Sequence, residues 1–146
     1  MRSLPLADAS VDGVICMWQS FGHFDDAMNR HVLGEMARVL RHGGRLVLDV
    51  YHREFHAPRV GERVIERDGV RAREIRSMRG DRLTARLCYE PEGGEDEFEW
   101  RLYTPNELAS LVTSLGFRTE LACAEFDEAL PASAEHPRMQ LVFERA

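Results

Sequence analysis

Two short apolar runs lie in the first third of the chain and predict strands. Residues 11–18 read V-D-G-V-I-C-M-W, and residues 45–51 read R-L-V-L-D-V-Y. Nearly continuous apolar runs of this length are typical of strands that are buried on both faces of a parallel sheet. We therefore expect both segments to be interior strands.

Between these runs the apolar positions change to a helical spacing. The residues that recur three or four positions apart, and so predict one buried helix face, are Val32, Leu33, Met36, Ala37 and Leu40. The pair Gly43-Gly44 is predicted to end this helix, because glycine accepts the left-handed conformation that a helix C-terminus often requires. Strand, helix and strand in succession predict a βαβ crossover in a parallel sheet.

Over residues 60–103 the pattern becomes alternating, as in antiparallel strands. Turn signals interrupt it at Asp68-Gly69, at Arg79-Gly80-Asp81 and at residues 91–94, which read P-E-G-G. Such signals between alternating runs predict an antiparallel meander. The Arg-Gly-Asp triplet is interpreted as a hairpin turn rather than as an adhesion motif, because a glycine is what such a turn needs.

A second helix follows the meander. Thr104-Pro105-Asn106-Glu107 has the form of a capping box with proline at the first helical position. Leu108, Leu111, Val112 and Leu115 are its expected buried stripe, and Gly116 its end. Two further strands, over residues 118–126 and 138–144 with a loop at 131–137, predict a final antiparallel hairpin.

Composition and charge narrow the class of protein. A chain of 146 residues with 44% hydrophobic residues has the size and core of one domain. No apolar run approaches the ~20 residues of a membrane helix, and the N-terminus does not read as a signal peptide, so we expect a cytoplasmic protein without membrane contact. The net charge of −6 opposes binding to nucleic acid.

The three cysteines, Cys16, Cys88 and Cys123, are odd in number and lack the C-x-x-C spacing. We expect buried thiols rather than a disulfide or a zinc site.

Three segments together resemble consecutive blocks of class I S-adenosylmethionine-dependent methyltransferases. They are residues 4–15 (L-P-L-A-D-A-S-V-D-G-V-I), residues 36–50 (M-A-R-V-L-R-H-G-G-R-L-V-L-D-V) and residues 101–117 (R-L-Y-T-P-N-E-L-A-S-L-V-T-S-L-G-F). The resemblance implies an α/β fold: part of a doubly wound, Rossmann-like sheet (strands four to seven) with an antiparallel meander inserted at about residues 60–103. Residues 1–146 would then be the C-terminal part of one methyltransferase domain, and S-adenosylmethionine its cofactor.

The loop at residues 16–24, C-M-W-Q-S-F-G-H-F, is similar to the loop after the fourth strand in glycine and sarcosine N-methyltransferases. Ligands of open parallel sheets bind beyond the carboxyl ends of the strands, where this loop lies. The resemblance implies that Arg2, Met17, Trp18 and His23 contact the cofactor, Arg2 and Met17 through their main chain.

On the acceptor side, Gln19 replaces the asparagine of those enzymes and is expected to orient a polar substrate group. Tyr51 stands where they carry an arginine that grips the substrate carboxylate, which argues against an amino-acid acceptor. The remaining residues expected to line the substrate pocket are Phe21, Phe24, Arg101 and Tyr103. Asp49 is interpreted as a polar residue at a strand end rather than as a catalytic base.

Parts of the implied cofactor site are not found in the sequence. It contains no glycine-rich turn after a strand and no acidic residue placed to hold the ribose. Relatives often read D-M-R-x-L-P before the fourth strand, and this chain begins M-R-S-L-P. We therefore expect Met1 to be the internal methionine of that motif, and the chain to be a fragment or a mis-started copy of a longer protein.

The leading hypothesis is methyl transfer from S-adenosylmethionine to a small metabolite, performed as part of a longer chain. The alternative is a catalytically silent module that uses the same half-sheet for self-association or partner binding. An apolar strand left at a sheet edge is prone to pair with another chain, so a homodimer is an expected state. A nicotinamide-dependent oxidoreductase is a weaker option, because no G-x-G-x-x-G follows a strand.

Overall fold

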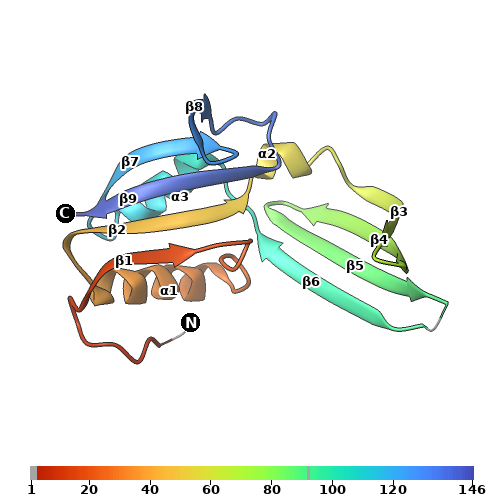
Figure 1. Cartoon of the computed structure of the whole chain (residues 1–146), viewed down its shortest axis with the longest axis horizontal. Helices are drawn as coiled ribbons and strands as arrows, with labels where there is room; N and C mark the ends of the chain where they lie inside the picture. Colours follow the sequence, from red (N-terminus) through yellow and green to blue (C-terminus); the bar gives the residue numbers. More distant parts are fainter. Residues whose placement is uncertain (1–2, 92) are drawn as a thin grey trace.

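The computed structural model describes residues 3–91 and 93–146, which form two sheets and the helices that pack on one of them (Figure 1). The elements, in chain order, are β1 (Val11–Cys16), α1 (Asp26–Val39), β2 (Leu40–Tyr51), α2 (Arg53–His56), β3 (Gly61–Arg67), β4 (Val70–Arg79), β5 (Arg82–Glu90), β6 (Glu95–Arg101), α3 (Pro105–Thr113), β7 (Phe117–Ala124), β8 (Asp127–Pro131) and β9 (Arg138–Arg145).

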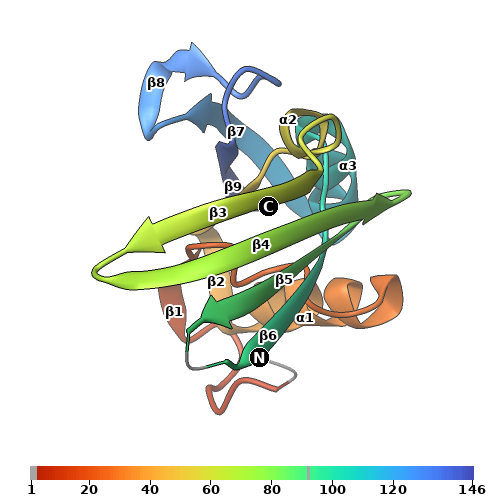
Figure 2. The same cartoon turned by 90° about the vertical axis from the view of Figure 1, so that its right-hand side faces the viewer.

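In the described residues, the first sheet has five strands in the order β1-β2-β9-β7-β8. β1 and β2 are parallel, as predicted, while β9 lies between β2 and β7 and runs antiparallel to both. Both long helices, α1 and α3, cover the same face of this sheet, as Figure 2 shows. The main core lies between that face and the helices, with Leu48, Leu141 and Phe143 fully buried.

Helix α1 buries the apolar face that the sequence predicts, but it ends earlier than predicted. Asp25 caps its start by accepting a hydrogen bond from the Met28 N–H at 2.8 Å. The helix ends at Val39, because Leu40 is extended and pairs with Val11 of β1. Gly43 (φ 75°) turns the chain within the β2 segment instead of ending the helix.

β1 is an edge strand, not the doubly buried interior strand that its apolar run predicts. It pairs with β2, and within the described residues no strand pairs with its other side. Its side chains alternate between the core and solvent: Cys16 is buried, whereas Ile15 is 72% exposed. The strand also ends at Cys16, two residues before the predicted end.

The second sheet has the order β3-β4-β5-β6, and each strand is antiparallel to the next. Its connections lie at the turn signals seen in the sequence. Asp68 and Gly69 have φ of 53° and 78° between β3 and β4, which suits a two-residue hairpin loop. In Figure 1 this sheet projects beyond the carboxyl ends of β1 and β2.

The C-terminal region contains one strand that the sequence did not predict. β7 ends at Ala124, not at 126, because Glu125 and Phe126 adopt positive φ (55° and 58°) and reverse the chain. β8 then pairs back on β7. The antiparallel pairing of β7 with β9 agrees with the predicted hairpin.

Helix α3 starts at the predicted capping box. The Thr104 hydroxyl accepts a hydrogen bond from the Glu107 N–H at 3.3 Å, and the Glu107 carboxylate accepts one from the Thr104 N–H at 2.9 Å. Leu108 and Val112 are fully buried beneath this helix.

All three cysteines are free thiols. Cys16 and Cys123 are buried as expected, whereas Cys88 is only half-buried, because it lies on β5 of the smaller sheet. In the described part of the chain, no helix is long and apolar enough to cross a membrane.

Candidate functional site

The loop between β1 and α1 lies where the carboxyl ends of β1 and β2 face the four-stranded sheet (Figure 1). A main-chain hydrogen bond joins this loop to the smaller sheet, from the Arg101 N–H of β6 to the Gly22 carbonyl at 2.7 Å. Arg82 also donates to the Phe24 carbonyl at 2.8 Å. The loop is therefore held between both sheets.

Asp49 anchors the start of this loop from the neighbouring strand. Its carboxylate accepts hydrogen bonds from the Trp18 N–H at 3.0 Å and from the Gln140 amide at 2.8 Å, and it pairs with Arg138. Burial alone would raise the pKa of Asp49, but these hydrogen bonds outweigh it and hold the pKa below its usual value. Asp49 is thus an ionised structural anchor, in line with its interpretation as a strand-end residue.

Gln19 is buried within the same loop and has φ of 57°. Its side-chain NH₂ donates to the Phe21 carbonyl at 2.9 Å, and its side-chain oxygen accepts from the Tyr51 N–H. Both ends of the amide are thereby engaged in holding the loop to the end of β2. Contact between Gln19 and a substrate stays a prediction.

An aromatic cluster forms where the loop meets β6. Trp100 of β6 lies with its ring centroid 5.7 Å from that of His23 and 5.9 Å from that of Tyr51. Arg138 places its guanidinium carbon 5.2 Å from the ring centroids of both Trp18 and Tyr51. We call Trp18, His23, Tyr51 and Trp100, with Arg138, the edge cluster.

Three of the five edge-cluster residues, Trp18, His23 and Tyr51, are among those that the sequence singled out. Trp100 and Arg138 were missed, because each reaches the cluster from a segment far along the chain. One signal for Arg138 was present in the sequence. Tyr51 stands where the similar enzymes carry an arginine, and Arg138, the cross-strand partner of Tyr51 on β9, places a guanidinium beside it. That guanidinium is bonded to Asp49.

His23 has a defined tautomer in the edge cluster. The Trp100 indole N–H donates to His23 Nε2 at 3.1 Å, so this nitrogen is an acceptor. In the neutral ring the proton then lies on Nδ1, which is left as a donor. His23 itself is exposed, as is Trp18, at 80%.

Phe21 and Tyr103 form the floor beneath the loop. Both are buried, and their rings stack with centroids 5.7 Å apart. Burial raises the pKa of Tyr103 to about 12, so its hydroxyl stays neutral. Phe24, half-buried, packs against the main core.

Arg101, the last predicted substrate residue, lies on the other side of β6 from Trp100. Its guanidinium pairs with Asp26 at 2.6 Å and with Asp81 at 3.1 Å. The structure therefore does not bring Arg101 together with the edge cluster.

Of the predicted cofactor contacts, Met17 lies at the first turn of the loop, where its carbonyl accepts hydrogen bonds from the Ser20 N–H (3.1 Å) and hydroxyl (2.5 Å). Arg2 lies outside the described residues, as does Met1. Among the residues that are described, no group of three or more His, Cys, Asp or Glu side chains could hold a metal ion.

These features define an α/β fold whose loops gather at the carboxyl edge of a mixed sheet. Residues 1–48 match the family model described as a methyltransferase domain. No curated protein matches the chain.

Solved structures resemble nearly the whole chain. An S-adenosylmethionine-dependent methyltransferase from Clostridium acetobutylicum has a TM-score of 0.85 at 12% identity over 98% of this chain, and the CcbJ methyltransferase from Streptomyces caelestis has 0.83 at 18% over 99%. CalS10, an amino pentose methyltransferase from Micromonospora echinaspora, has 0.68 at 18% over 99%. The chain spans 61%, 61% and 62% of these proteins' lengths, respectively. The chain thus has the fold of S-adenosylmethionine-dependent methyltransferases, as the resemblance implied.

Proposed function

We propose that this chain provides the acceptor side of a methyltransferase that uses S-adenosylmethionine to methylate a small molecule. The observation that carries the proposal is the edge cluster, in which aromatic faces and one polar donor meet beyond the carboxyl ends of two parallel strands. Ligands of open α/β sheets bind at this edge. The methyltransferase fold supports the same reaction class.

The residues present fit one side of the cofactor. The exposed ring of Trp18 offers a face at the tip of the loop, and His23 lies five residues further on. The Met17 carbonyl already accepts two hydrogen bonds from Ser20, so an amino group of the cofactor would replace the Ser20 hydroxyl there. When bound, S-adenosylmethionine supplies an electrophilic methyl group.

The chain's own residues would then bind and orient the acceptor. The rings of Tyr51 and Trp100 suit the apolar face of a cyclic methyl acceptor. The His23 Nδ1–H suits an oxygen or nitrogen atom of that molecule, other than the atom that attacks the methyl group. Alignment of the attacking atom with the methyl group supplies most of the acceleration in such displacements, and Asp49 maintains that alignment by fixing the loop.

We further propose that residues other than these 146 complete this site. These residues carry no glycine-rich turn between a strand and a helix, and the chain spans about 60% of the length of the structures it resembles. Residues 61–101 would be an insert that covers the acceptor side of one domain.

The two tryptophans of the chain, Trp18 and Trp100, both lie in the edge cluster, so their indole N–H signals in a ¹⁵N NMR spectrum report on it directly. On titration with millimolar S-adenosylmethionine we expect the Trp18 signal to shift, together with main-chain signals of residues 17–24. Absence of any shift at 10 mM, or shifts confined to another face, would contradict the proposal.

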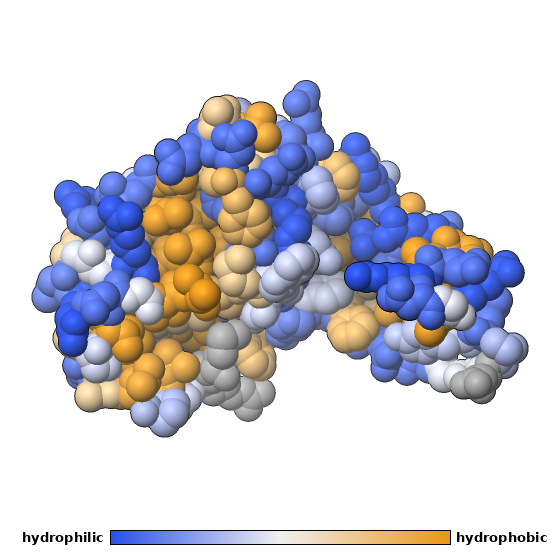
Figure 3. All heavy atoms as spheres, in the orientation of Figure 1, coloured by the Kyte–Doolittle hydropathy of each residue, from blue (hydrophilic) through white to orange (hydrophobic). Residues whose placement is uncertain are grey.

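A second candidate function rests on the face of the five-stranded sheet that α1 and α3 do not cover. Ile15, Val47, Val142 and Leu121 are neighbours across four strands of this face. Figure 3 shows an apolar band over these strands. Exposed contiguous apolar surface of this kind marks an interaction site, which supports a module for self-association or partner binding.

Light scattering during size-exclusion chromatography distinguishes this second function. If the open face mediates self-association, the chain is dimeric or larger, and Ile15→Lys makes it monomeric. Val64→Lys is the matched control, because Val64 is 57% exposed on the other sheet. A wild-type chain that stays monomeric at high concentration would contradict self-association.

A further inference from the structure

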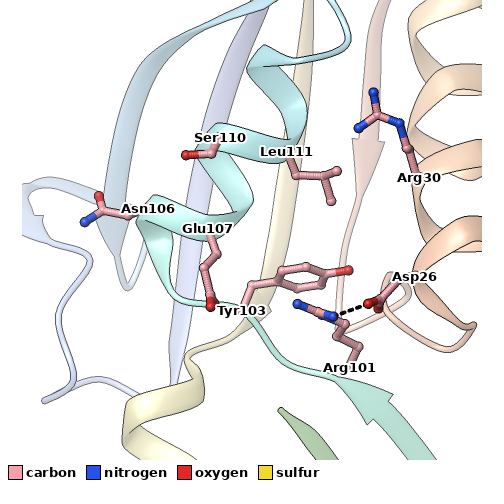
Figure 4. Close-up of a pocket in the computed structure, with 8 residues that line it drawn as sticks. All are labelled: Asp26, Arg30, Arg101, Tyr103, Asn106, Glu107, Ser110 and Leu111. Atoms are coloured by element: carbon pink, nitrogen blue, oxygen red, sulfur yellow. Dashed lines mark hydrogen bonds and ion pairs between the residues drawn. The ribbon is translucent and has the colours of Figure 1, made fainter. Parts of the chain in front are cut away.

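A cleft separates α1 from α3 on the helix-covered side of the five-stranded sheet (Figure 4). Its volume is about 540 Å³, within the range of ligand pockets. Leu111 of α3 and the ring of Tyr103 line one side, and Arg30 projects from α1 on the other. Arg101 and Asp26 close the end nearest to β6.

This cleft is distinct from the edge cluster. Consecutive side chains of a strand point to opposite faces, and β6 ends with Trp100 and Arg101. Trp100 reaches His23 in the edge cluster, whereas Arg101 reaches Asp26 in the cleft. A molecule in the cleft would therefore lie on the opposite side of β6 from the proposed methyl acceptor.

Among the described residues, the charges that line the cleft leave the Arg30 guanidinium without a carboxylate partner. Asp26 is paired with Arg101 at 2.6 Å, and Glu107 with Arg53 at 2.7 Å, so both lining carboxylates already have an arginine. Arg30 instead donates to a neutral group, the Ser114 hydroxyl, at 2.8 Å.

Arg101 is already compensated, because its guanidinium pairs with both Asp26, at 2.6 Å, and Asp81, at 3.1 Å. Among the described residues, its buried Nε has no hydrogen-bond partner. That nitrogen is shielded from solvent, so it adds no accessible donor to the cleft. Arg30 is therefore the lining cation that favours a negatively charged ligand group.

We propose that this cleft is a second binding site, for a small organic anion with an apolar body, of the class of aryl-substituted carboxylates. Its carboxylate would bind Arg30, and its ring would lie against Leu111 and Tyr103. Guanidinium–carboxylate hydrogen bonds are among the stronger polar contacts, and a mainly apolar pocket with few polar groups suits a ligand of this form. The site goes beyond the proposed methyl transfer and does not depend on it.

The test is isothermal titration calorimetry of the 146-residue chain with 3-phenylpropanoate. We expect saturable binding at one site per chain. Uncharged 3-phenylpropan-1-ol should bind about tenfold more weakly or less, because it lacks the anionic group.

Two variants locate the site independently. Arg30→Gln should weaken 3-phenylpropanoate binding about tenfold, and Ser110→Trp, at an exposed position of α3 that lines the cleft, should abolish it by filling the space. Arg41→Gln is the matched control, since Arg41 pairs with Asp12 away from the cleft, and it should bind like the wild type. The proposal would be overturned if the wild type shows no saturable binding up to 10 mM. It would also be overturned if Arg30→Gln and Ser110→Trp bind 3-phenylpropanoate as tightly as the wild type does.

Discussion

Asp49 holds the start of the loop after β1 in place. Its side chain is 2% exposed and holds Arg138, Gln140 and the Trp18 N–H. Asp49→Asn leaves the Arg138 charge without its partner, and breaking a buried pair in this way costs about 3 kcal/mol. Urea unfolding at pH 7 measures the loss.

Asp12→Asn is the control for that substitution. Asp12 pairs with Arg41, but its side chain is 84% exposed, so its removal should change the free energy of unfolding by less than about 0.5 kcal/mol. Equal effects of the two substitutions would contradict the anchoring role of Asp49. Because the folded pKa of Asp49 is lowered, its contribution is present above the ordinary carboxyl pKa and is lost as pH falls through the folded value.

His56 makes the free energy of unfolding depend on pH, over a higher pH range than Asp49 does. Its Nε2 lies 3.0 Å from the Pro137 carbonyl and its Nδ1 lies 3.2 Å from an Arg76 nitrogen, so the ring is neutral with the proton on Nε2. Burial lowers the pKa of His56 to about 4, below the ordinary 6.5. The unfolded chain therefore binds a proton first, and the free energy of unfolding should fall by up to about 3 kcal/mol between pH 6.5 and 4.

Urea unfolding across this pH range tests the role of His56. His56→Gln should flatten the slope, leaving the part due to His52, whose pKa burial also lowers. His42→Gln, at an exposed histidine, should keep the wild-type slope. If His56→Gln unfolds with the wild-type pH dependence, the assignment is wrong.

At this residue scale, the sequence located the loop but not its internal bonds. Resemblance and position at a strand end were enough to single out Trp18, His23 and Tyr51. The hydrogen bond between Trp100 and His23 joins residues 77 positions apart, and no local pattern encodes such a contact.

At the scale of elements, the junction between the loop and β6 depends on Gly22. This glycine has φ of 101°, and a Cβ there would lie 2.6 Å from the Arg101 carbonyl oxygen. Gly22→Ala should therefore cost about 3 kcal/mol or more in urea unfolding, because main-chain strain adds to a clash with main-chain atoms.

Gly80→Ala separates the two causes. Gly80 also has positive φ, 62°, but a Cβ there meets nothing within 4 Å. It should cost only about 1 to 2 kcal/mol, the strain of the left-handed conformation. If both variants lose a similar free energy of unfolding, the close contact between Gly22 and Arg101 contributes nothing to the cost of Gly22→Ala.

The sequence predicted element boundaries correctly where a local side chain marks them. It did not predict them where the pairing of strands sets the boundary. The capping box at Thr104 and the Asp68-Gly69 turn are local, and both lie where predicted. The end of α1 at Val39 is set by the pairing of Leu40 with Val11, and the strand β8 by the pairing with β7. Neither contact leaves a periodic pattern.

At the scale of the whole molecule, these 146 residues should bind S-adenosylmethionine only weakly. The edge cluster offers one side of the cofactor, and the sequence contains no glycine-rich turn to hold the other. Isothermal titration calorimetry should give a dissociation constant well above the micromolar range. Saturable micromolar binding at one site per chain would contradict this account of the site.

The sequence predicted the arrangement of the parallel pair and of the smaller sheet better than their surroundings. Alternation and turn residues determine the β3–β6 sheet locally, but the exposure of β1 depends on which strands flank it. An apolar run alone does not distinguish an interior strand from an edge strand.

The chain enters the segment that contains the smaller sheet, and returns from it, at neighbouring residues of the main fold. His52 and Tyr103 form a parallel bridge, and the Arg53 N–H donates to the Tyr103 carbonyl at 3.1 Å. The 50 residues between them therefore form a closed excursion, and exchanging it for a shorter or longer one changes the loop-closure entropy only slowly with length. The surface above the edge cluster can therefore be exchanged as one segment, while the register of β2 with β9 stays the same.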